Sequence, residues 1–329
     1  MKFLKFLGWL IVIVMTLAAG GLLFIWVFLA QPSLKRSSPS DVSVSPVNLE
    51  AHVRKLAIEF SPRNAAHIGN TNRTADYIKQ QFEGIYAPGV SEQRFQVGSY
   101  RYRNVSLLIG NPEDERIVIG AHYDGFGPYQ AADDNASGVA GLIELARLCA
   151  NHDFGTAIEF VAYPLEEPPY FGTGNMGSAR HASDIAAQGR ACRFMISLEM
   201  IGYFSDEPDS QKYPHPLLYL FYPSKGNFIT VVGNTENRRL TKSIKTGMKG
   251  ATSLKVRSLC GPASIPGIDF SDHRNYWATG VPAVMVTDTA FYRNLAYHTS
   301  GDTADRLDYK KMAMVVVGVY EALQQNRHF

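Results

Sequence analysis

The chain has 329 residues, of which 46% are hydrophobic, 12% aromatic and 19% charged, and its formal net charge is +2. This composition is that of a globular protein and excludes wholesale disorder. Lys and Arg are scattered, with no basic stripe interleaved with aromatic residues, so the sequence gives no indication of nucleic-acid binding.

The amino-terminal segment differs from the rest of the chain. Residues 6–30 contain no charged side chain and are long enough, as a helix, to cross a hydrocarbon core of roughly 30 Å. A cleaved signal peptide is the alternative, since Ala18-Ala19-Gly20 offers small residues for cleavage. The apolar run continues past that point, which favours an uncleaved anchor over residues 1–30, in contact with the lipid bilayer through residues 6–30.

The charges that flank this segment bear on its orientation. Lys2 and Lys5 precede it together with the amino terminus, and Lys35 and Arg36 follow it. The positive-inside rule leans toward an amino terminus inside the cytoplasm. We therefore expect a single-pass membrane protein whose catalytic domain lies outside the cytoplasm, in the periplasm or in an extracellular or lumenal space.

The segment that follows, residues 31–47, is rich in Ser, Pro and Val and has no helical periodicity, which is typical of a juxtamembrane linker. We expect the folded catalytic domain at 48–329. Apolar residues at helical spacing predict its first two helices at 49–60 and 71–82.

Strands and helices alternate through the remainder of the chain. Short runs rich in β-branched residues predict strands at 104–109, 116–121, 157–163, 194–198, 228–232 and 282–287. Helical patterns predict helices at 136–151, 236–249, 272–279 and 309–325. This alternation predicts an α/β fold of three layers, α/β/α, around a mostly parallel mixed sheet.

In such a sheet, loops at the carboxyl ends of the strands direct side chains into a common crevice. His122 ends an apolar strand, with Asp124 two residues later. Neutral imidazole is a common zinc ligand, and a carboxylate on its other nitrogen fixes the tautomer. Alone, this pattern is more typical of a solvated turn or a hydrogen-bonded histidine.

A second acidic motif, Asp133-Asp134-Asn135-Ala136-Ser137-Gly138, precedes a predicted helix. Helix capping explains one acidic residue at such a position, but not readily two followed by Asn. A carboxylate here has two oxygens, each of which can bind a different cation.

Four further candidates come from two other strand ends and one late loop. Glu166 and Glu167 follow one strand, Glu199 ends another, and His298 lies in a loop before the last helix. Of two adjacent carboxylates, one can hold a metal while the other removes a proton from water. Five strand-end or loop positions each supply an oxygen or nitrogen ligand suited to zinc. The independent occurrence of all five by chance is implausible.

This ordered set resembles the co-catalytic di-zinc aminopeptidases of peptidase family M28, whose relatives include glutamate carboxypeptidase II and glutaminyl cyclase. The resemblance covers about residues 48–327 and implies a zinc-exopeptidase-like domain. It implies two zinc ions, or other divalent metals, with Asp134 as the bridging ligand. The resemblance also implies that His122 and Glu199 bind one ion and that Glu167 and His298 bind the other.

The resemblance also implies an activity, the removal of amino-terminal residues from peptides with a free amino terminus. Glu166 would be the general base, and Asp124 would orient His122. Many members have Asp where this chain has Glu199, which leaves the metal geometry open. The residues after Glu167, 168–176, are an insertion relative to the simplest members, and we expect them to shape the substrate pocket.

Other functions on the same fold remain as alternatives: another hydrolase, an aminoacyl cyclase, or a receptor-like binding module without catalysis. The three cysteines allow at most one internal disulfide. Cys149 is expected to be a buried free thiol, and Cys192 and Cys260 can pair only if their strands approach. The sequence indicates neither the preferred substrate residue nor the oligomeric state.

Overall fold

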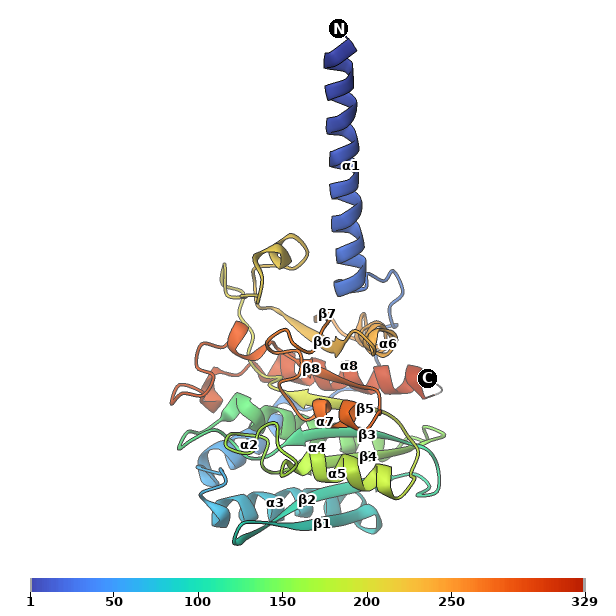
Figure 1. Cartoon of the computed structure of the whole chain (residues 1–329). Coiled ribbons are helices and arrows are strands. Elements are labelled where there is room, and N and C mark those ends of the chain that lie inside the picture. The colour runs from blue at the N-terminus through green and yellow to red at the C-terminus, as the bar shows by residue number, and fades with distance from the viewer. Residues whose placement is uncertain (1, 328–329) are drawn as a thin grey trace.

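The computed structural model describes residues 2–327 (Figure 1). The helices are α1 (Lys2–Ala30), α2 (Pro46–Arg54), α3 (Ile68–Tyr86), α4 (Gly138–Cys149), α5 (Gly177–Ala187), α6 (Arg238–Met248), α7 (His273–Ala278) and α8 (Tyr309–Asn326). The strands are β1 (Val90–Val97), β2 (Tyr100–Ile109), β3 (Arg116–His122), β4 (Ala157–Tyr163), β5 (Cys192–Glu199), β6 (Phe228–Asn234), β7 (Lys255–Gly261) and β8 (Ala283–Thr287). Two short helical turns also matter below, η3 (Ala132–Ser137) and η4 (Pro216–Leu220).

All of the described strands form one sheet in the order β1-β2-β4-β3-β5-β8-β6-β7. The four central strands, β4, β3, β5 and β8, run parallel, whereas β2 is antiparallel to β4 and β6 is antiparallel to β8. Parallel strands joined through helices are covered on both faces, and every residue of β3 and of β4 is accordingly buried.

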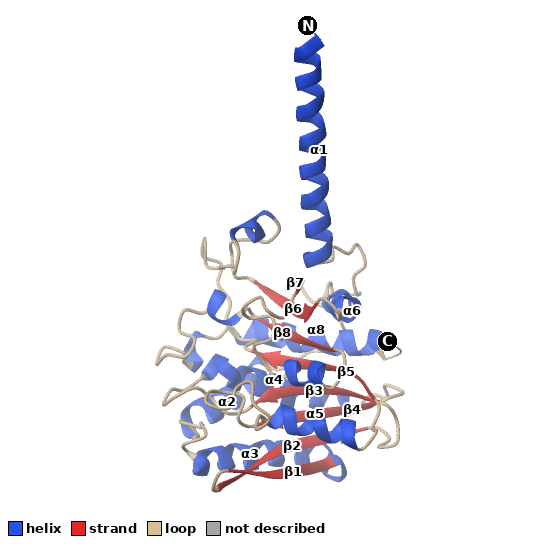
Figure 2. Cartoon of the chain, in the orientation of Figure 1, coloured by secondary structure: helices blue, strands red, loops and turns tan. Residues whose placement is uncertain are grey.

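The two faces of the sheet are packed by different helices (Figure 2). Successive side chains of a strand point to opposite faces. On β3, Ile117 and Ile119 join the main core with residues of α2, α3, α4, α6 and α8. Val118 instead packs in a smaller cluster with Ala182 of α5 and Tyr276 of α7. The predicted three-layer arrangement with a mostly parallel mixed sheet is confirmed.

Three elements were missed by the sequence patterns: β1, β7 and α5. Both strands lie at the edges of the sheet, where one side of the backbone faces solvent and charged side chains are favoured. Their sequences, VSEQRFQV and KVRSLCG, therefore lack an apolar run. Helix α5 consists largely of small and polar residues, GSARHASDIAA, and Ile185 is its one large apolar residue, so a search for repeated large apolar residues does not find it.

The cysteines are all free in the structure, and Cys149 is buried as expected. Cys192 lies on β5 and Cys260 on β7, and two other strands separate these in the sheet. The strands do not approach, so no disulfide joins the two residues.

A buried ion pair links two central strands. Arg116 of β3 donates a hydrogen bond from Nη1 to Oε2 of Glu159 on β4 at 2.8 Å, and His181 lies 3.3 Å from the other oxygen. Burial raises the pKa of Glu159, but His181 and Arg116 outweigh it and bring that pKa down to about 2. Glu159 is therefore ionised in the folded protein at neutral pH.

Replacing Glu159 with Gln is expected to lower the free energy of unfolding by about 3 kcal/mol at pH 7, because it leaves Arg116 charged and buried without a counter-ion. Since the folded pKa is depressed, the advantage of the parent chain is complete above the ordinary Glu pKa of 4.5 and shrinks as pH falls toward 2. Denaturant unfolding in detergent measures it. Glu113→Gln, at an exposed site, is the matched control and should change stability by less than about 0.5 kcal/mol.

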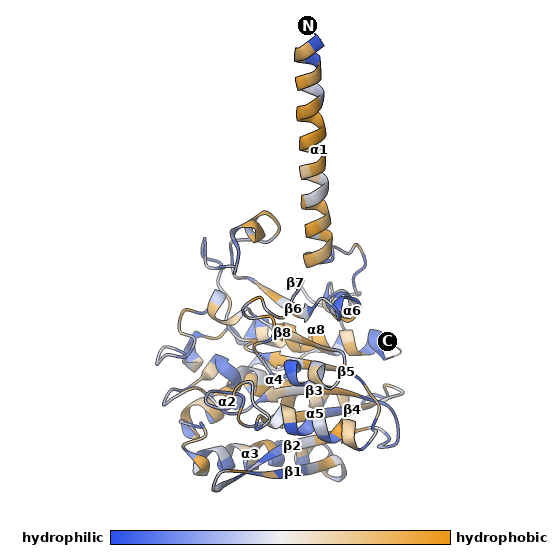
Figure 3. Ribbon diagram, viewed as in Figure 1, coloured by the Kyte–Doolittle hydropathy of each residue, from blue (hydrophilic) through white to orange (hydrophobic). Residues whose placement is uncertain are grey.

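Helix α1 projects from the β7 edge of the sheet and is mostly hydrophobic along its length (Figure 3). It is the one described helix long and apolar enough to cross a membrane, and none of its apolar window is buried against the domain. Residues 31–45 contain no helix or strand and lie against the domain. Ser37 N donates to Lys249 O at 2.7 Å, and Ser40 Oγ donates to Glu321 at 2.6 Å.

Candidate functional site

The predicted site residues come together at the carboxyl ends of the central strands. His122 is the last residue of β3 and Glu199 the last of β5, and Glu166 and Glu167 follow β4. Asp134 lies in η3, immediately before α4, and His298 lies in the loop between β8 and α8. Because β3, β4 and β5 are parallel neighbours, their ends meet at one edge of the sheet.

Asp134 stands at the centre of the cluster, with one carboxylate oxygen toward each histidine. Its Oδ1 is 3.4 Å from Nε2 of His122, and its Oδ2 is 3.1 Å from Nε2 of His298. His122 Nε2 is also 3.3 Å from Glu199, and His298 Nε2 is 3.2 Å from Glu167. The ligand atoms therefore form two groups, His122/Asp134/Glu199 and Asp134/Glu167/His298, that share Asp134.

The chemistry of these two groups fits metal ions. Both nitrogens of the buried His122, Nε2 of His298 and Oε1 of Glu167 have no hydrogen-bond partner among the described residues. Carboxylates taken out of water need nearby positive charge, and the ion pairs within the cluster involve only the two histidines. Each group supplies the nitrogen and oxygen ligands that zinc accepts. The ligand role of each residue stays a prediction.

Glu166 lies beside the two groups without belonging to either. Its Oε2 is 3.9 Å from Nε2 of His122. Burial, together with the neighbouring carboxylates of Glu199 and Glu167, raises the pKa of Glu166 well above its ordinary value. A carboxylate near the cluster but outside the ligand groups is placed to exchange protons with a bound water or substrate.

Asp124 ties two of the strand ends together. Its Oδ1 accepts a hydrogen bond from the backbone N–H of Glu166 and its Oδ2 from that of Glu167, both at 3.1 Å. The same Oδ1 lies 3.5 Å from Nδ1 of His122. One carboxylate therefore positions both the predicted base and a predicted ligand of each metal.

The remaining polar residues of the acidic motif hold η3 against the end of β5. Asn135 donates to Leu198 O at 2.8 Å and accepts from the N–H of Met200 at 3.0 Å. Asp133, the other acid of the pair, accepts from Gly202 N at 3.0 Å and from Asn294 at 3.1 Å. These contacts fix the backbone on either side of Glu199 and explain why the motif extends beyond one acid.

Arg63 is a buried residue of the site that the sequence patterns did not reveal. Its guanidinium donates to three backbone carbonyls, those of Tyr123 at 2.9 Å and of Gln130 and Ala131 at 2.5 Å. It thus joins the loop after His122 to the segment before Asp134. No local pattern marks such a contact, because its partners are backbone atoms about 60 residues away in sequence.

His298 is held between two aromatic rings. Phe126 stacks on one face with 3.9 Å between ring centroids, and Tyr297 stacks at 3.7 Å. Asp302 supports the same region, because its carboxylate accepts from the backbone N–H groups of Asp133 at 2.9 Å and Asp134 at 3.1 Å. The sequence offered no signal for these three residues beyond their nearness to predicted ligands.

Two residues near the start of α7 behave differently from each other. Ser271 donates a hydrogen bond to Glu199 at 2.7 Å and so orients a predicted ligand. His273 instead contacts Ile268 O at 2.8 Å, and burial lowers the pKa of its imidazole to about 4. His273 belongs to neither ligand group.

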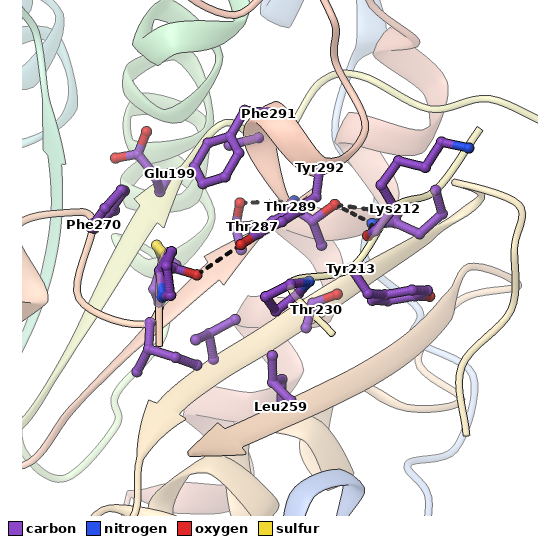
Figure 4. A pocket seen from close by; sticks show the side chains of 18 of the residues that line it. Glu199, Lys212, Tyr213, Thr230, Leu259, Phe270, Thr287, Thr289, Phe291 and Tyr292 are labelled. Atoms are coloured by element: carbon purple, nitrogen blue, oxygen red, sulfur yellow. Dashed lines mark hydrogen bonds between the residues drawn. The ribbon is translucent and has the colours of Figure 1, made fainter. Parts of the chain in front are cut away.

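An apolar cavity of about 760 Å³, partly open to solvent, adjoins the site at Glu199. In Figure 4, Glu199 lies near Phe270 and Phe291, while Leu259 and Tyr213 lie farther along the cavity. No residue of 168–176 lines it, although Phe171 packs against Phe270 with 5.8 Å between ring centroids. Residues 211–214 and 285–292 supply much of the wall instead.

Comparison with known sequences agrees with this geometry. The model of Peptidase family M28 matches residues 104–322. The chain is 44% identical over 305 residues to the uncharacterized protein YfbL of Escherichia coli (strain K12), covering 90% of this chain and 93% of that protein. Leucine aminopeptidase 1 of Coccidioides posadasii (strain C735) is 26% identical over 247 residues, which cover 70% of this chain and 57% of that protein.

Solved structures share the fold. The LapA aminopeptidase of Legionella pneumophila superposes with a TM-score of 0.67 at 22% identity, over 85% of this chain and 72% of that one. The glutaminyl cyclase of Fimbriiglobus ruber gives a TM-score of 0.63 at 18% identity, over 89% of this chain and 98% of that one. The family match and the similarity to YfbL confirm the resemblance seen in the sequence: the chain belongs to peptidase family M28 and is a metallo-exopeptidase.

Proposed function

We propose that this protein is a zinc-dependent aminopeptidase that holds two metal ions and uses Glu166 as its general base. The observation that carries the proposal is the pair of ligand groups that share Asp134, with Glu166 outside both groups and 3.9 Å from Nε2 of His122. The proposed ligands are His122, Asp134 and Glu199 for one ion and Asp134, Glu167 and His298 for the other. The name of the related Leucine aminopeptidase 1 supports the same activity.

The residues of the site divide the work of peptide hydrolysis. Bound zinc would supply a Lewis acid that lowers the pKa of water and polarises the scissile carbonyl. Glu166 takes a proton from the attacking water and delivers it to the leaving amine. Asp124 keeps Glu166 and Glu167 in place through their backbone N–H groups, and the rings of Phe126 and Tyr297 hold His298 in one orientation.

The experiment is an assay of the full chain, purified in detergent and supplied with zinc or cobalt, on a panel of aminoacyl p-nitroanilides. We expect hydrolysis that stops on chelation and returns on adding metal, with no turnover of the same substrates once their amino group is acetylated. Acetylation is the critical control, because an aminopeptidase needs a free amine and an endopeptidase does not. Inactivity toward every member of the panel, in protein with a full metal content, would overturn the proposal.

The adjoining cavity predicts a preference for large apolar first residues. Its aromatic and aliphatic lining favours a leucine or phenylalanine side chain and disfavours a charged one, which would lose its hydration there. We expect kcat/KM for leucyl and phenylalanyl substrates to exceed that for the alanyl substrate by roughly 10- to 100-fold. Equal values for alanyl, aspartyl and leucyl substrates would show that the cavity does not receive the first side chain.

An aminoacyl cyclase is the second candidate, because glutaminyl cyclases share this fold. Two complete ligand groups favour a two-metal hydrolase over that alternative. Mass spectrometry of a peptide that begins with glutamine separates them: hydrolysis releases the first residue, whereas cyclisation lowers the mass of the intact peptide by one ammonia. A binding module without catalysis would give neither product.

We also propose that α1 anchors the protein in a membrane, with the catalytic domain outside the cytoplasm. Support comes from the length and hydropathy of α1 and from its exposed apolar surface. Carbonate extraction of membranes, followed by amino-terminal sequencing, tests it, because a cleaved signal sequence would leave a shorter chain in the soluble fraction.

A further inference from the structure

A second cavity, partly open to solvent and with about 540 Å³ of empty space, lies where α1 meets the catalytic domain. Its walls include Trp26 and Ala30 of α1, Phe221 and Tyr222 after η4, and residues of α6 and β7. The carboxyl end of α1 is fixed to the domain at this point, since Ser258 donates a hydrogen bond to Ala30 O at 2.8 Å. The cavity therefore has a fixed position at the carboxyl end of the proposed membrane span.

Three basic side chains line this cavity: Lys245, Lys249 and Arg257. Lys245 is only 4% exposed, and its Nζ bonds to the carbonyls of Ala30 and Gln31. No carboxylate among the described residues forms an ion pair with any of the three. A concentration of positive charge without acidic partners, part of it buried, is suited to an anion from outside the protein.

The cations next to Lys245 also favour the binding of an anion. Burial, followed by the neighbouring cations Lys249, Lys242 and Arg257, lowers the pKa of Lys245 to about 8. The Lys249 ammonium also donates to Ser33 O at 2.6 Å, so it bonds to the segment that leaves α1. The protein thus brings cations together at the end of α1 against their mutual repulsion.

Trp26, Phe221 and Tyr222 are aromatic residues of the cavity wall, and further aromatic and apolar groups lie at the carboxyl end of α1 and in η4. Arg238, at the start of α6, stacks over the ring of Phe28 with 3.9 Å to the centroid. The η4 turn, gold in Figure 1, projects beyond the carboxyl end of α1 on the side of the membrane span. Its Leu217, Tyr219 and Leu220 are 48%, 44% and 64% exposed. Aromatic residues beside basic ones are typical of the interfacial layer of a bilayer.

We propose that this cavity binds the headgroup of an anionic phospholipid, with the tip of η4 lying in the interfacial layer of the membrane beside it. The phosphate would contact Lys249 and Arg257, and the acyl chains would lie along Trp26 and the rest of α1. The inference rests on the proposed anchoring of α1 and is independent of the proposed peptidase activity. A bound headgroup would hold the catalytic domain in one orientation relative to the membrane, because the walls of the site come from both α1 and the domain.

Native mass spectrometry of the full chain, released from micelles with equal amounts of phosphatidylglycerol and phosphatidylcholine, tests the headgroup site. Each basic side chain near a membrane surface contributes roughly fivefold in binding. We expect retention of phosphatidylglycerol over phosphatidylcholine by at least about fivefold in the parent chain, and nearly equal retention in Lys249→Gln/Arg257→Gln. The matched control, Arg101→Gln/Arg190→Gln, removes the same charge from exposed positions elsewhere and should behave as the parent does.

Three results would overturn the headgroup site. They are equal retention of the two lipids by the parent chain, the same loss in both double variants, and full displacement of the lipid by inorganic phosphate alone. The Lys249→Gln/Arg257→Gln variant is expected to keep the thermal unfolding curve and the detergent-assayed peptidase activity of the parent. If neither chain hydrolyses peptides, the proposed function fails while the lipid result stands, and carbonate extraction reports separately on the anchor.

The place of η4 has its own measurement. An environment-sensitive NBD label at Leu220→Cys, in a chain with Cys192→Ser, should shift to the blue on transfer from solution-exposed surroundings into lipid vesicles. The control label at Tyr100→Cys lies at the β1–β2 turn, on the opposite edge of the sheet from β7, and should not shift. Equal spectra for the two labels in vesicles would exclude η4 from the interfacial layer.

Discussion

Replacing Asp134 with Ala is expected to remove both metal ions and to lower kcat/KM by at least about 10³-fold, since metal assistance contributes several kcal/mol to such a reaction. The reason is geometric. One carboxylate oxygen lies toward His122 and the other toward His298, so a single side chain belongs to both ligand groups. Metal analysis per chain and kinetics on a leucyl substrate, measured on the same preparation, check the two effects together.

The neighbouring Asp133→Asn is the matched control. The Asp133 carboxylate bonds to Gly202 and Asn294 rather than to a histidine, and burial together with Asp288 raises its pKa well above the ordinary value. Asn keeps the size of this side chain and one oxygen that can still accept a hydrogen bond, and Asp133 belongs to neither ligand group, so we expect Asp133→Asn to lose much less metal than Asp134→Ala. Full metal occupancy in Asp134→Ala, or equal losses in the two variants, would contradict the assignment of Asp134 as the shared ligand.

The position of the site could be predicted from the sequence because the fold is an alternating one. Apolar runs ending in His122 and Glu199 identify strands, and parallel strands deliver their carboxyl ends to one edge of the sheet. Asp134 follows the same logic at the start of α4. The structure places these side chains in two groups that share Asp134, and the metal-ligand role of each residue stays a prediction.

The supporting residues could not be predicted in the same way. Arg63 acts through three backbone carbonyls, and Asp302 acts through two backbone N–H groups. Such contacts are set by tertiary packing and leave no periodic pattern in the chain. The same reason applies to the rings of Phe126 and Tyr297, whose value lies in their stacking on His298.

The edge strands of the sheet could not be predicted from the sequence patterns either. β7 carries Lys255 and Arg257 because one side of it faces outward, and this hid the strand from a search for apolar runs. Arg257 also lines the cavity at the end of α1, where it contributes to the proposed headgroup site. The charge of Arg257, which made β7 hard to recognise in the sequence, therefore has a proposed role in the folded protein.

Glu166→Gln is expected to lower kcat by about 10²- to 10⁴-fold while leaving metal content unchanged, because Gln cannot accept the proton that a general base removes. KM should change little, since the amide has the same size and the backbone N–H of Glu166 still bonds to Asp124. Steady-state kinetics on a leucyl substrate measure kcat and KM, and metal analysis of the same sample measures the metal content.

Glu167→Gln is the comparison variant, because it separates the loss of a metal ligand from the loss of a general base. Glu167 belongs to a ligand group and Glu166 does not, although the two are adjacent in the chain and bond to the same carboxylate. We expect Glu167→Gln to lose metal affinity and to recover part of its activity at high zinc, whereas no zinc concentration rescues Glu166→Gln. If added zinc restored both variants alike, both glutamates would act as metal ligands, and the assignment of Glu166 as the general base would be wrong.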